Sequence, residues 1–503
     1  GGAFGGKESQ PTQWAALAAL AALKTGKPVK CRLDRDDDMI MTGKRHDVEG
    51  HWSVAFNEKG LILAADVNMA TRAGSSKDLT DAISDRAMFH VDNAYYLNAV
   101  RIKCNRCKTN TVSNTAFRGF GGPQGMMLGE RMIESVARYL GKDPLEIRKL
   151  NFYSTKGRNV TPYHMVVDDF VLNEIVSELE KDSNYWKRRS KITSYNNNDQ
   201  SNIRRGLALT PVKFGISFTN KALNQGGALV HVYKDGSIHL NHGGTEMGQG
   251  LFMKVAQIVA QEFQVDAKRV KISPANTGKV PNTSATAASS GTDINGMAAL
   301  NAAREIKQRL ISFAAKEFGV ASKQVQFLPN RVQAGNHVVT FNELVNLAYF
   351  DRVQLSATGF YRTPKIDYDR KRGCGRPFFY FSYGAAVSEV AIDILTGESR
   401  VMAVDILHDV GESINPAIDM GQIEGGFIQG MGWLTSEELY WDDKGVLQTH
   451  SPSVYKIPTC SDLPEHFNVK IWDKGSNKEK TIHRSKAVGE PPLMLAISVF
   501  HAI

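Results

Sequence analysis

A glutamate between a glycine and two prolines, near the C-terminus of this 503-residue chain, restricts the backbone more tightly than any other stretch. It lies in residues 485–492, SKAVGEPP. Pro491 and Pro492 have a fixed φ and no amide hydrogen, and a residue before proline is disfavoured in the helical region. We therefore expect Glu490 on a stiff, extended turn, followed by an apolar helix-like run at 493–500. Such a mounting would suit an acid with a chemical role, but taken alone the stretch fits a rigid loop with a solvated glutamate better, and only further motifs in the chain change that preference.

The composition is that of an ordinary globular protein, with 42% hydrophobic and 22% charged residues. No apolar run approaches the roughly 18 residues that a membrane-spanning helix needs. The net charge of +9 comes from scattered basic residues, and the nearest cluster is KRRSK at 187–191. We interpret this cluster and the asparagines after it as a solvated linker. The scatter argues against a nucleic-acid-binding surface.

The cysteines are few and odd in number: Cys31, Cys104, Cys107, Cys374 and Cys460. This usage favours a reducing compartment, and we expect a cytoplasmic protein rather than a disulfide scaffold. Cys104 and Cys107 form a single CxxC without a second pair, so we expect a structural role rather than a zinc site.

Start and stop signals such as proline near the first position and glycine after the last predict three helices in the first part of the chain, at 11–23, at 124–140 and from residue 144. Pro11 precedes an Ala/Leu run that ends before Gly26, which is typical of a helix start and end. The many alanines suggest that this first helix packs in the core. Asp143 is an N-cap residue before Pro144. We expect short strands at 29–33, 51–56 and 61–69.

The second part of the chain mixes strands and helices without regular alternation, which predicts an α+β fold. A strand is expected at 206–218, and Lys234-Asp235-Gly236 predicts a hairpin between 228–233 and 237–241. Helices are expected at 251–263, at about 293–318 and from near Pro416, and a strand pair around Thr396-Gly397.

A polar segment at 153–203 divides the chain. It contains one amphipathic helix, at 172–179, and the basic linker. We therefore predict a first subdomain at 1–152, this helix and linker at 153–203, and a second subdomain at 204–503. The chain starts without an initiator methionine or a signal peptide and stops in mid-pattern at Ile503. We expect a piece of a longer polypeptide, truncated at the N-terminus.

The glycine loop at 1–8, GGAFGGKE, nearly matches the phosphate-binding pattern G-x-x-x-x-G-K-[ST]. A nucleotide-binding loop needs a hydroxyl at the eighth position to hold magnesium, and this chain has Glu8 there. The acid argues against nucleotide binding. The glycines still allow a ligand to approach the backbone, so Phe4 and Glu8 are expected to line a pocket.

Two further loops precede predicted helices: HGGTEMGQG at 242–250 and NTSATAASSGT at 282–292. Backbone N–H groups at a helix start, the amide of Gln249 and the hydroxyls would suit the phosphate of a cofactor. Each loop alone could be an ordinary turn. A third loop is NTAFRGFGGPQ at 114–124. Its Arg118 guanidinium could orient a ligand through paired hydrogen bonds and its Phe120 ring could stack on a ligand; the alternative is an arginine packed against its own loop.

These five motifs, in the order in which they follow one another along the chain, resemble the molybdenum-binding part of the xanthine dehydrogenase and oxidase family, over essentially the whole chain. Glu8 after GGK and Arg86 before AMFH resemble the purine-oxidising members rather than the aldehyde oxidases. The resemblance implies two mixed α/β molybdopterin-binding subdomains. It also implies that the dithiolene sulfurs of molybdopterin hold the molybdenum without a protein ligand.

The resemblance implies a role for each matched residue. Glu490 would be the general base, Arg86 would stabilise negative charge on the substrate ring, and Glu8 would orient the substrate. The substrate would be sandwiched or bordered by Phe120, Phe218, Phe4, Ala287 and Ala288. The cofactor would contact Gly5, Gly6, Arg118, Gln249, Gln422, Thr286 and Ser289. The metal would lie near Phe4, Arg118, Ala288 and Glu490.

The implied reaction is hydroxylation of a purine, xanthine or hypoxanthine to urate, with water as the oxygen source. The alternatives are an aldehyde or N-heterocycle oxidase on the same scaffold, or a cofactor-free, inactive fragment. The 2Fe–2S clusters and FAD are expected on parts outside this chain, in a dimer of the larger assembly. Ala3 and Asn220-Lys221-Ala222 depart from the family pattern near the pocket.

Overall fold

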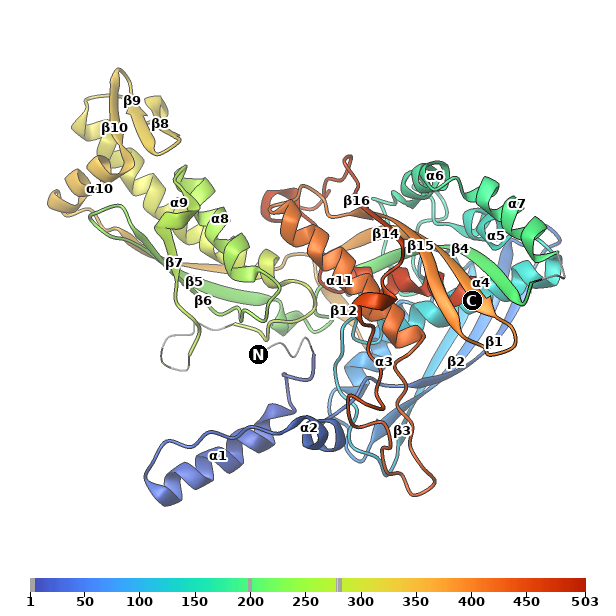
Figure 1. Ribbon diagram of the computed structural model, residues 1–503. Coiled ribbons are helices and arrows are strands. Elements are labelled where there is room, and N and C mark those ends of the chain that lie inside the picture. The colour runs from blue at the N-terminus through green and yellow to red at the C-terminus, as the bar shows by residue number, and fades with distance from the viewer. Residues whose placement is uncertain (1–4, 198–200, 277, 279–282) are drawn as a thin grey trace.

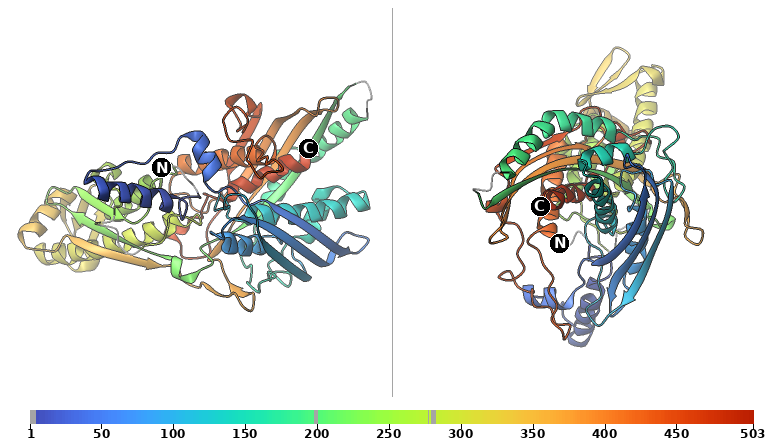
Figure 2. Two further views of the ribbon diagram at one scale, coloured as in Figure 1. Left: turned by 90° about the horizontal axis from the view of Figure 1, so that it is seen from below. Right: turned by 90° about the vertical axis from the view of Figure 1, so that its right-hand side faces the viewer.

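The structure, a computed structural model, describes residues 5–197, 201–276, 278 and 283–503. The predictions for Phe4 and the glycines before it lie outside these ranges. Figures 1 and 2 show an elongated molecule with two lobes. The small lobe is residues 225–362, and the large lobe comprises the described residues before and after it. Mixed sheets and helices in both lobes confirm the α+β prediction.

The large lobe contains two main sheets, which are largely antiparallel. The first has the order β1-β2-β3, formed by Val48–Phe56, Ile62–Gly74 and Ala99–Lys108. The second has the order β16-β15-β14-β4, formed by His466–Ile471, Ser399–Asp409, Tyr380–Asp393 and Ile203–Ile216. Only β2–β3 and β15–β16 pair in parallel within these two sheets. A two-stranded ribbon, β12 (Asp367–Asp369) and β13 (Cys374–Arg376), lies nearby in the chain.

Strand β4 is covered on both faces, because its side chains alternate between two cores. Leu207 and Leu209 pack with helix α6, whereas Ala208 and Val212 pack with the C-terminal helices. These surrounding helices are α6 (Leu172–Asp182), α7 (Tyr185–Asn196), the 3₁₀ helix η6 (Pro491–Ala496) and α12 (Ile497–Ala502). The sheet therefore forms the centre of the large lobe, with the C-terminal motif against one face.

The other helices of the large lobe are α1 (Pro11–Thr25), α2 (Arg35–Met41), α3 (Thr80–Phe89), α4 (Gly122–Leu140), α5 (Pro144–Asn151) and α11 (Pro416–Leu434). Helices α3 and α4 pack against the first sheet, whereas α11 packs on η6 and β16. Helix α4 packs unusually close to α3, and only glycine permits this contact. A Cβ added at Gly125 would lie 2.1 Å from the Ala87 carbonyl oxygen. The glycine-rich start of α4 thus fixes α3 beside the loop that carries Arg118.

The small lobe is a four-stranded sheet of order β11-β5-β6-β7 with two long helices packed on it. Its strands are Ser356–Arg362, Gln225–Val232, Ile238–His242 and Val270–Ile272, and its helices are α8 (Leu251–Phe263) and α9 (Gly291–Glu317). At its tip lie β8 (Val325–Leu328), β9 (Arg331–Ala334), β10 (His337–Thr340) and α10 (Phe341–Phe350). The loops before α8 and α9 both face the large lobe (Figure 1).

Most predicted elements are confirmed, including α4, α5, α6, α8, α9, α11, the hairpin around residue 235 and the strand pair around residue 396. The predicted strand at 29–33 is wrong, since these residues form no regular element. The interpretation of 187–197 as a solvated linker is also wrong. This segment is helix α7, in which Arg188 pairs with Asp405 at 2.8 Å and Arg189 with Asp143 at 2.9 Å.

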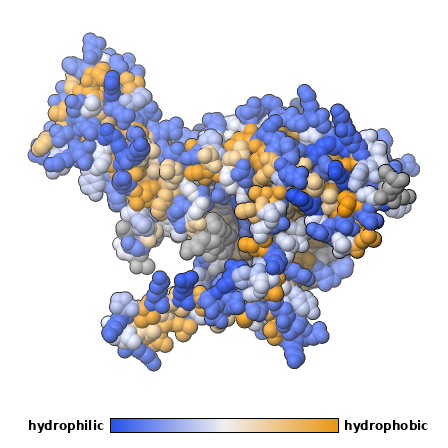
Figure 3. All heavy atoms as spheres, viewed as in Figure 1, coloured by the Kyte–Doolittle hydropathy of each residue, from blue (hydrophilic) through white to orange (hydrophobic). Residues whose placement is uncertain are grey.

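Helix α1 forms as predicted, but its predicted place in the core is wrong. It projects from the large lobe as an arm (Figure 1), and none of its residues is buried. Leu17, Leu20 and Leu23 are 56%, 51% and 82% exposed, and Figure 3 shows apolar side chains along this arm. An alanine-rich composition permits close packing but does not specify a partner within the described residues.

All five cysteines are free thiols. Cys104 is buried in β3 and Cys107 is exposed, so the CxxC pair does not converge on one site. Within the described ranges, no three His, Cys, Asp or Glu side chains gather in a way that could hold a metal ion. No helix of the described chain has both the length and the apolarity to cross a bilayer.

Candidate active site

A cavity of about 380 Å³ lies where the two lobes meet, and six distant segments of the chain line it. Ligand sites typically occupy about 300–1,000 Å³ at such junctions. The lining segments fall within residues 5–8, 116–120, 247–254, 286–293, 414–429 and 485–490. All five motifs singled out in the sequence therefore contribute to a single site.

Glu490 lines this cavity, and hydrogen bonds hold both oxygens of its carboxylate. Oε1 accepts from the Gly119 N–H at 3.1 Å, and Oε2 accepts from the Ser289 hydroxyl at 2.7 Å. The Glu490 N–H also donates to Ser289 Oγ, at 2.9 Å. The acid is thus fixed from two loops, one in each lobe, which excludes the alternative of a solvated glutamate.

The prediction of an extended backbone at Glu490 is wrong. Its φ is −96° and its ψ is −42°, which is helical, and it is the N-cap residue of η6. The bias against this conformation before proline is a preference rather than a prohibition. Here a 3₁₀ hydrogen bond from the Leu493 N–H to the Glu490 carbonyl, at 3.1 Å, accompanies the helical backbone.

Helix α11 supports η6 through glycines that no larger residue could replace without movement. A Cβ at Gly430 would lie 2.1 Å from the Leu493 carbonyl oxygen, and one at Gly426 would lie 2.7 Å from Cβ of Pro492. The backbone that follows Glu490 therefore rests directly on α11. Close packing of this kind holds the acid in place together with its hydrogen bonds.

Arg118 links the cavity wall to the same C-terminal motif. Its Nε donates to the Gly489 carbonyl at 2.6 Å, and its two terminal nitrogens donate to Gln429 Oε1 and the Gln422 carbonyl, each at 3.2 Å. Burial lowers the pKa of Arg118 to about 10, and the nearby Glu490 opposes this shift. The guanidinium therefore remains charged at neutral pH.

The loop at 286–289 enters the cavity with two successive residues in the left-handed region. The φ of Ala288 is 56° and that of Ser289 is 55°, which is strained for residues with a Cβ. This geometry brings Ala287, Ala288 and Ser289 to the cavity. The Thr245 N–H donates to the Thr286 hydroxyl at 2.9 Å, so the two small-lobe loops support each other.

The expectation of a free anion site at the start of α8 is wrong. The carboxylate of Glu246 accepts from the N–H groups of Gly248, Gly250 and Phe252 at 2.8, 3.1 and 2.9 Å. An acid of the loop itself thus occupies the donors at this helix start. Gln249 still lines the cavity, held by a bond from its Nε2 to the Thr245 carbonyl at 2.9 Å.

Glu8 brings a second carboxylate to the cavity. Lys7 Nζ lies 3.0 Å from its Oε1, whereas its Oε2 is buried and has no hydrogen-bond partner among the described residues. A buried acceptor without a partner is costly unless a ligand satisfies it. Gly5 and Phe120 also line the cavity, and their roles toward cofactor and substrate stay predictions.

Three predicted residues are not among the described residues that line the cavity: Arg86, Phe218 and Gly6. Arg86 is buried between the rings of Phe214 and Phe378 and donates to the carbonyl of Ser217 at 2.9 Å. Phe218 follows that carbonyl in the chain and is half-buried. Their substrate roles, and the cofactor role of Gly6, stay predictions.

The cavity also contains charged residues to which the sequence analysis gave no role. Lys254 pairs with Asp419, and Asp293 accepts from the Tyr380 hydroxyl at 2.7 Å. Burial raises the pKa of Asp293 to about 7, against the hydrogen bond from Tyr380. A lysine among the apolar residues at 251–256 was the available signal. The partner of Lys254 lies 165 residues away, which a single sequence does not indicate.

Two family models, each described as a molybdopterin cofactor-binding domain, match the chain, one over residues 1–152 and the other over residues 178–464. Together with the glycine and hydroxyl loops around one cavity, these matches place the chain in the molybdopterin cofactor-binding domain family. Within that class, the chain is 46% identical over its whole length to a xanthine dehydrogenase/oxidase of Felis catus. It is also 46% identical to a xanthine dehydrogenase of Oryza sativa subsp. japonica. The resemblance drawn from the motifs is confirmed.

The chain spans only 36% of the length of each of these two relatives. Among solved structures, the Cu,Mo-CO dehydrogenase superposes with a TM-score of 0.86 at 21% identity, over 97% of this chain and 62% of that one. The aldehyde oxidoreductase of Desulfovibrio gigas superposes with a TM-score of 0.82 at 23% identity, over all of this chain and 51% of that one. These structures share the fold.

Proposed function

We propose that this chain is the catalytic part of a molybdenum hydroxylase that oxidises a purine, xanthine or hypoxanthine, with water as the oxygen source. The observation that carries the proposal is the pair of carboxylates in one cavity. Glu490 is held by donors on both oxygens, and Glu8 has one acceptor oxygen that no described residue contacts with a hydrogen bond. The identity with xanthine dehydrogenases over the whole chain supports the choice of a purine.

The residues present fit molybdopterin. Arg118, Gln249 and Gln422 offer one cation and two neutral amides to the cavity, which suits a polar heterocycle with a phosphate. A Cβ added at Gly425 meets no atom within 4 Å, so α11 leaves open room beside Gln422. These three side chains, with Gly5 and residues 286–289, would hold the cofactor. When bound, it supplies a metal centre that accepts two electrons from the substrate.

The protein's own contribution to the reaction is proton transfer and orientation. Glu490 takes the proton from the attacking water at a carboxylate oxygen that Ser289 or Gly119 already holds in place. Glu8 Oε2 accepts a hydrogen bond from a purine N–H and so orients the ring, and Phe120 offers an aromatic face for the ring to pack against. We keep Arg86 and Phe218 as predicted substrate residues, because Arg86 supports the turn that carries Phe218.

The larger assembly follows from the same proposal. Electrons must leave the reduced centre, and the relatives are much longer than this chain, so we place 2Fe–2S clusters and FAD on other parts of the enzyme. We further propose a dimer of that assembly, located in the cytoplasm, since the five cysteines are free thiols.

The test is turnover by the enzyme that contains this chain together with its iron–sulfur and FAD parts. We expect molybdenum in the purified enzyme, and xanthine or hypoxanthine oxidised with a higher kcat/KM than an aromatic aldehyde. A clear preference for the aldehyde would replace the purine with an aldehyde or N-heterocycle substrate. An enzyme without molybdenum and without turnover would overturn the proposal.

A further inference from the structure

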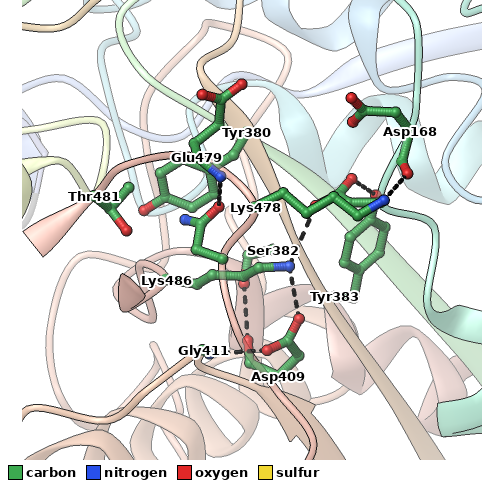
Figure 4. A network of polar contacts seen from close by, with 12 residues as sticks. Asp168, Tyr380, Ser382, Tyr383, Asp409, Gly411, Lys478, Glu479, Thr481 and Lys486 are labelled. Atoms are coloured by element: carbon green, nitrogen blue, oxygen red, sulfur yellow. Dashed lines mark hydrogen bonds and ion pairs between the residues drawn. The ribbon is translucent and has the colours of Figure 1, made fainter. Parts of the chain in front are cut away.

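Lys486, four residues before Glu490, forms a buried ion pair that none of the proposed chemistry uses. Its Nζ lies 2.7 Å from Asp409 Oδ2 and 3.4 Å from Asp169 Oδ2, and its side chain is 1% exposed. Figure 4 shows the ammonium beside Asp409 and next to the ring of Tyr383. The distance from Nζ to the centre of that ring is 4.8 Å. Three segments far apart in the chain therefore converge on one side chain.

The backbone around Lys486 is held at the same place. The Lys486 N–H donates to the Val410 carbonyl at 2.7 Å, so the segment pairs with the chain just after β15. The next amide, of Ala487, donates to the Tyr380 hydroxyl at 2.9 Å. At the other end of the segment, Ser289 and Gly119 hold Glu490. Residues 485–490 thus cross the cavity wall between two fixed ends.

We propose that Lys486 is a positioning residue for Glu490. The inference rests on the proposed function, in which Glu490 is the general base. The ammonium fixes the near end of a five-residue segment whose far end carries the reacting carboxylate. Displacing a catalytic group by about 1 Å can lower a rate a hundredfold. A cation placed to prevent that displacement would act on kcat without touching the substrate.

The charges around Lys486 keep its amine protonated, as the positioning role requires. Burial favours the neutral amine, but the carboxylates of Asp409 and Asp169 outweigh it and raise the pKa of Lys486. Each acid has a second donor: the Gly411 N–H to Asp409 Oδ1 and the Tyr383 hydroxyl to Asp169 Oδ1, both at 2.8 Å. Lys486 therefore acts as a permanent cation rather than as a proton donor in turnover.

The decisive variant is the double substitution Lys486→Met with Asp409→Asn, made in the complete enzyme. It removes one positive and one negative charge together, so the core keeps its net charge. A matched control exists in the same lobe: Lys213 lies 3.2 Å from Asp92, both are 1% exposed, and neither lines the cavity. The control is Lys213→Met with Asp92→Asn.

Two measurements separate positioning from a structural role. The first is kcat per bound molybdenum. We expect it to fall about tenfold to a hundredfold in the variant Lys486→Met with Asp409→Asn, called the Lys486 pair below, and less than twofold in the control. KM for xanthine should change less than about threefold in both. The second is hydrogen exchange at the amides of residues 486, 487 and 490, which we expect to quicken at least about tenfold in the Lys486 pair only.

Unchanged kcat and unchanged exchange in the Lys486 pair would overturn the proposal, as would an equal loss of kcat in the control. Should the double variant not fold, Asp169→Asn replaces it and keeps the Lys486–Asp409 pair. We then expect a fall in kcat of about threefold with faster exchange at residue 487, and wild-type values for both would overturn the proposal. The exchange measurement needs no substrate. It therefore still tests Lys486 if the wild-type enzyme proves unable to oxidise a purine.

Discussion

Replacing Glu490 with glutamine should remove proton transfer while leaving the site folded. The amide can stay in contact with both present partners: its oxygen accepts from the Gly119 N–H, and its NH₂ donates to Ser289 Oγ, whose hydroxyl donates to the carboxylate in the wild type. The Ser289 hydroxyl hydrogen then loses its acceptor but can turn toward the cavity that Ser289 lines, so the loss of stability should stay below about 1.5 kcal/mol. The loss of a general base costs about 10²–10⁴ in rate, or about 2.7–5.5 kcal/mol of barrier. Catalysis should therefore suffer far more than folding.

The assay is steady-state oxidation of xanthine by the complete enzyme, normalised to bound molybdenum, together with thermal unfolding. Glu437→Gln is the control, because Glu437 is a carboxylate outside the cavity that accepts from the Tyr455 hydroxyl at 2.6 Å. We expect kcat/KM to fall at least about a hundredfold for Glu490→Gln and to stay within about twofold for the control. Turnover within about threefold of wild type would refute the role of Glu490, and loss of molybdenum would refute the claim that the site stays intact.

Three further outcomes follow from the contacts described. Glu8→Leu should raise KM for xanthine at least about tenfold and KM for an aromatic aldehyde much less, because only the purine donates a hydrogen bond to Glu8 Oε2. Steady-state kinetics with both substrates checks this, and an equal rise in KM for both would contradict it. Gly430→Ala should destabilise the protein by about 1–3 kcal/mol, since its Cβ meets the Leu493 carbonyl; an unchanged thermal midpoint would show that η6 can move away. Burial raises the pKa of Asp293 to about 7, so the folded state binds this proton more tightly than the unfolded state, where the pKa is near 3.8. The stability from this proton should be fully present below about pH 4 and be lost as pH rises through 7, and denaturant unfolding should show a flatter pH dependence for Asp293→Asn.

The sequence allowed the cavity loops to be predicted because their signals are local. Glycines and hydroxyls before a helix, as in 242–250 and 286–289, mark backbone that turns tightly whatever the rest of the chain does. Arg118 and Phe120 were found in the same way. What each loop binds could not be predicted in this way. The carboxylate of Glu246 accepts from the backbone N–H groups before α8, and this contact depends on the folded path of the loop rather than on its composition.

Pairs that are distant in the chain were beyond prediction from one sequence. Lys486 and Asp409 lie 77 residues apart, and the sequence around either residue does not indicate that the other is its partner. The exposure of α1 could not be predicted either. The sequence indicates an apolar helix there, but whether such a helix is buried depends on which other elements pack against it. Arg86 was identified through a motif, yet its guanidinium faces backbone carbonyls of the turn that includes Ser217. Identity of a residue is local information, whereas the direction of its side chain is not.

The paired hydrogen bonds between Ser289 and Glu490 span 201 residues and join the two lobes at the point where chemistry is proposed. Moving the two lobes apart by about one or two ångströms would break both at once, because hydrogen bonds weaken steeply beyond their normal length. Glu490 therefore keeps both bonds to Ser289 only while the lobes stay at this distance. A ligand that contacts both lobes would stabilise this arrangement by the difference in its affinity for the joined and the separated lobes, and would thereby hold the base in place.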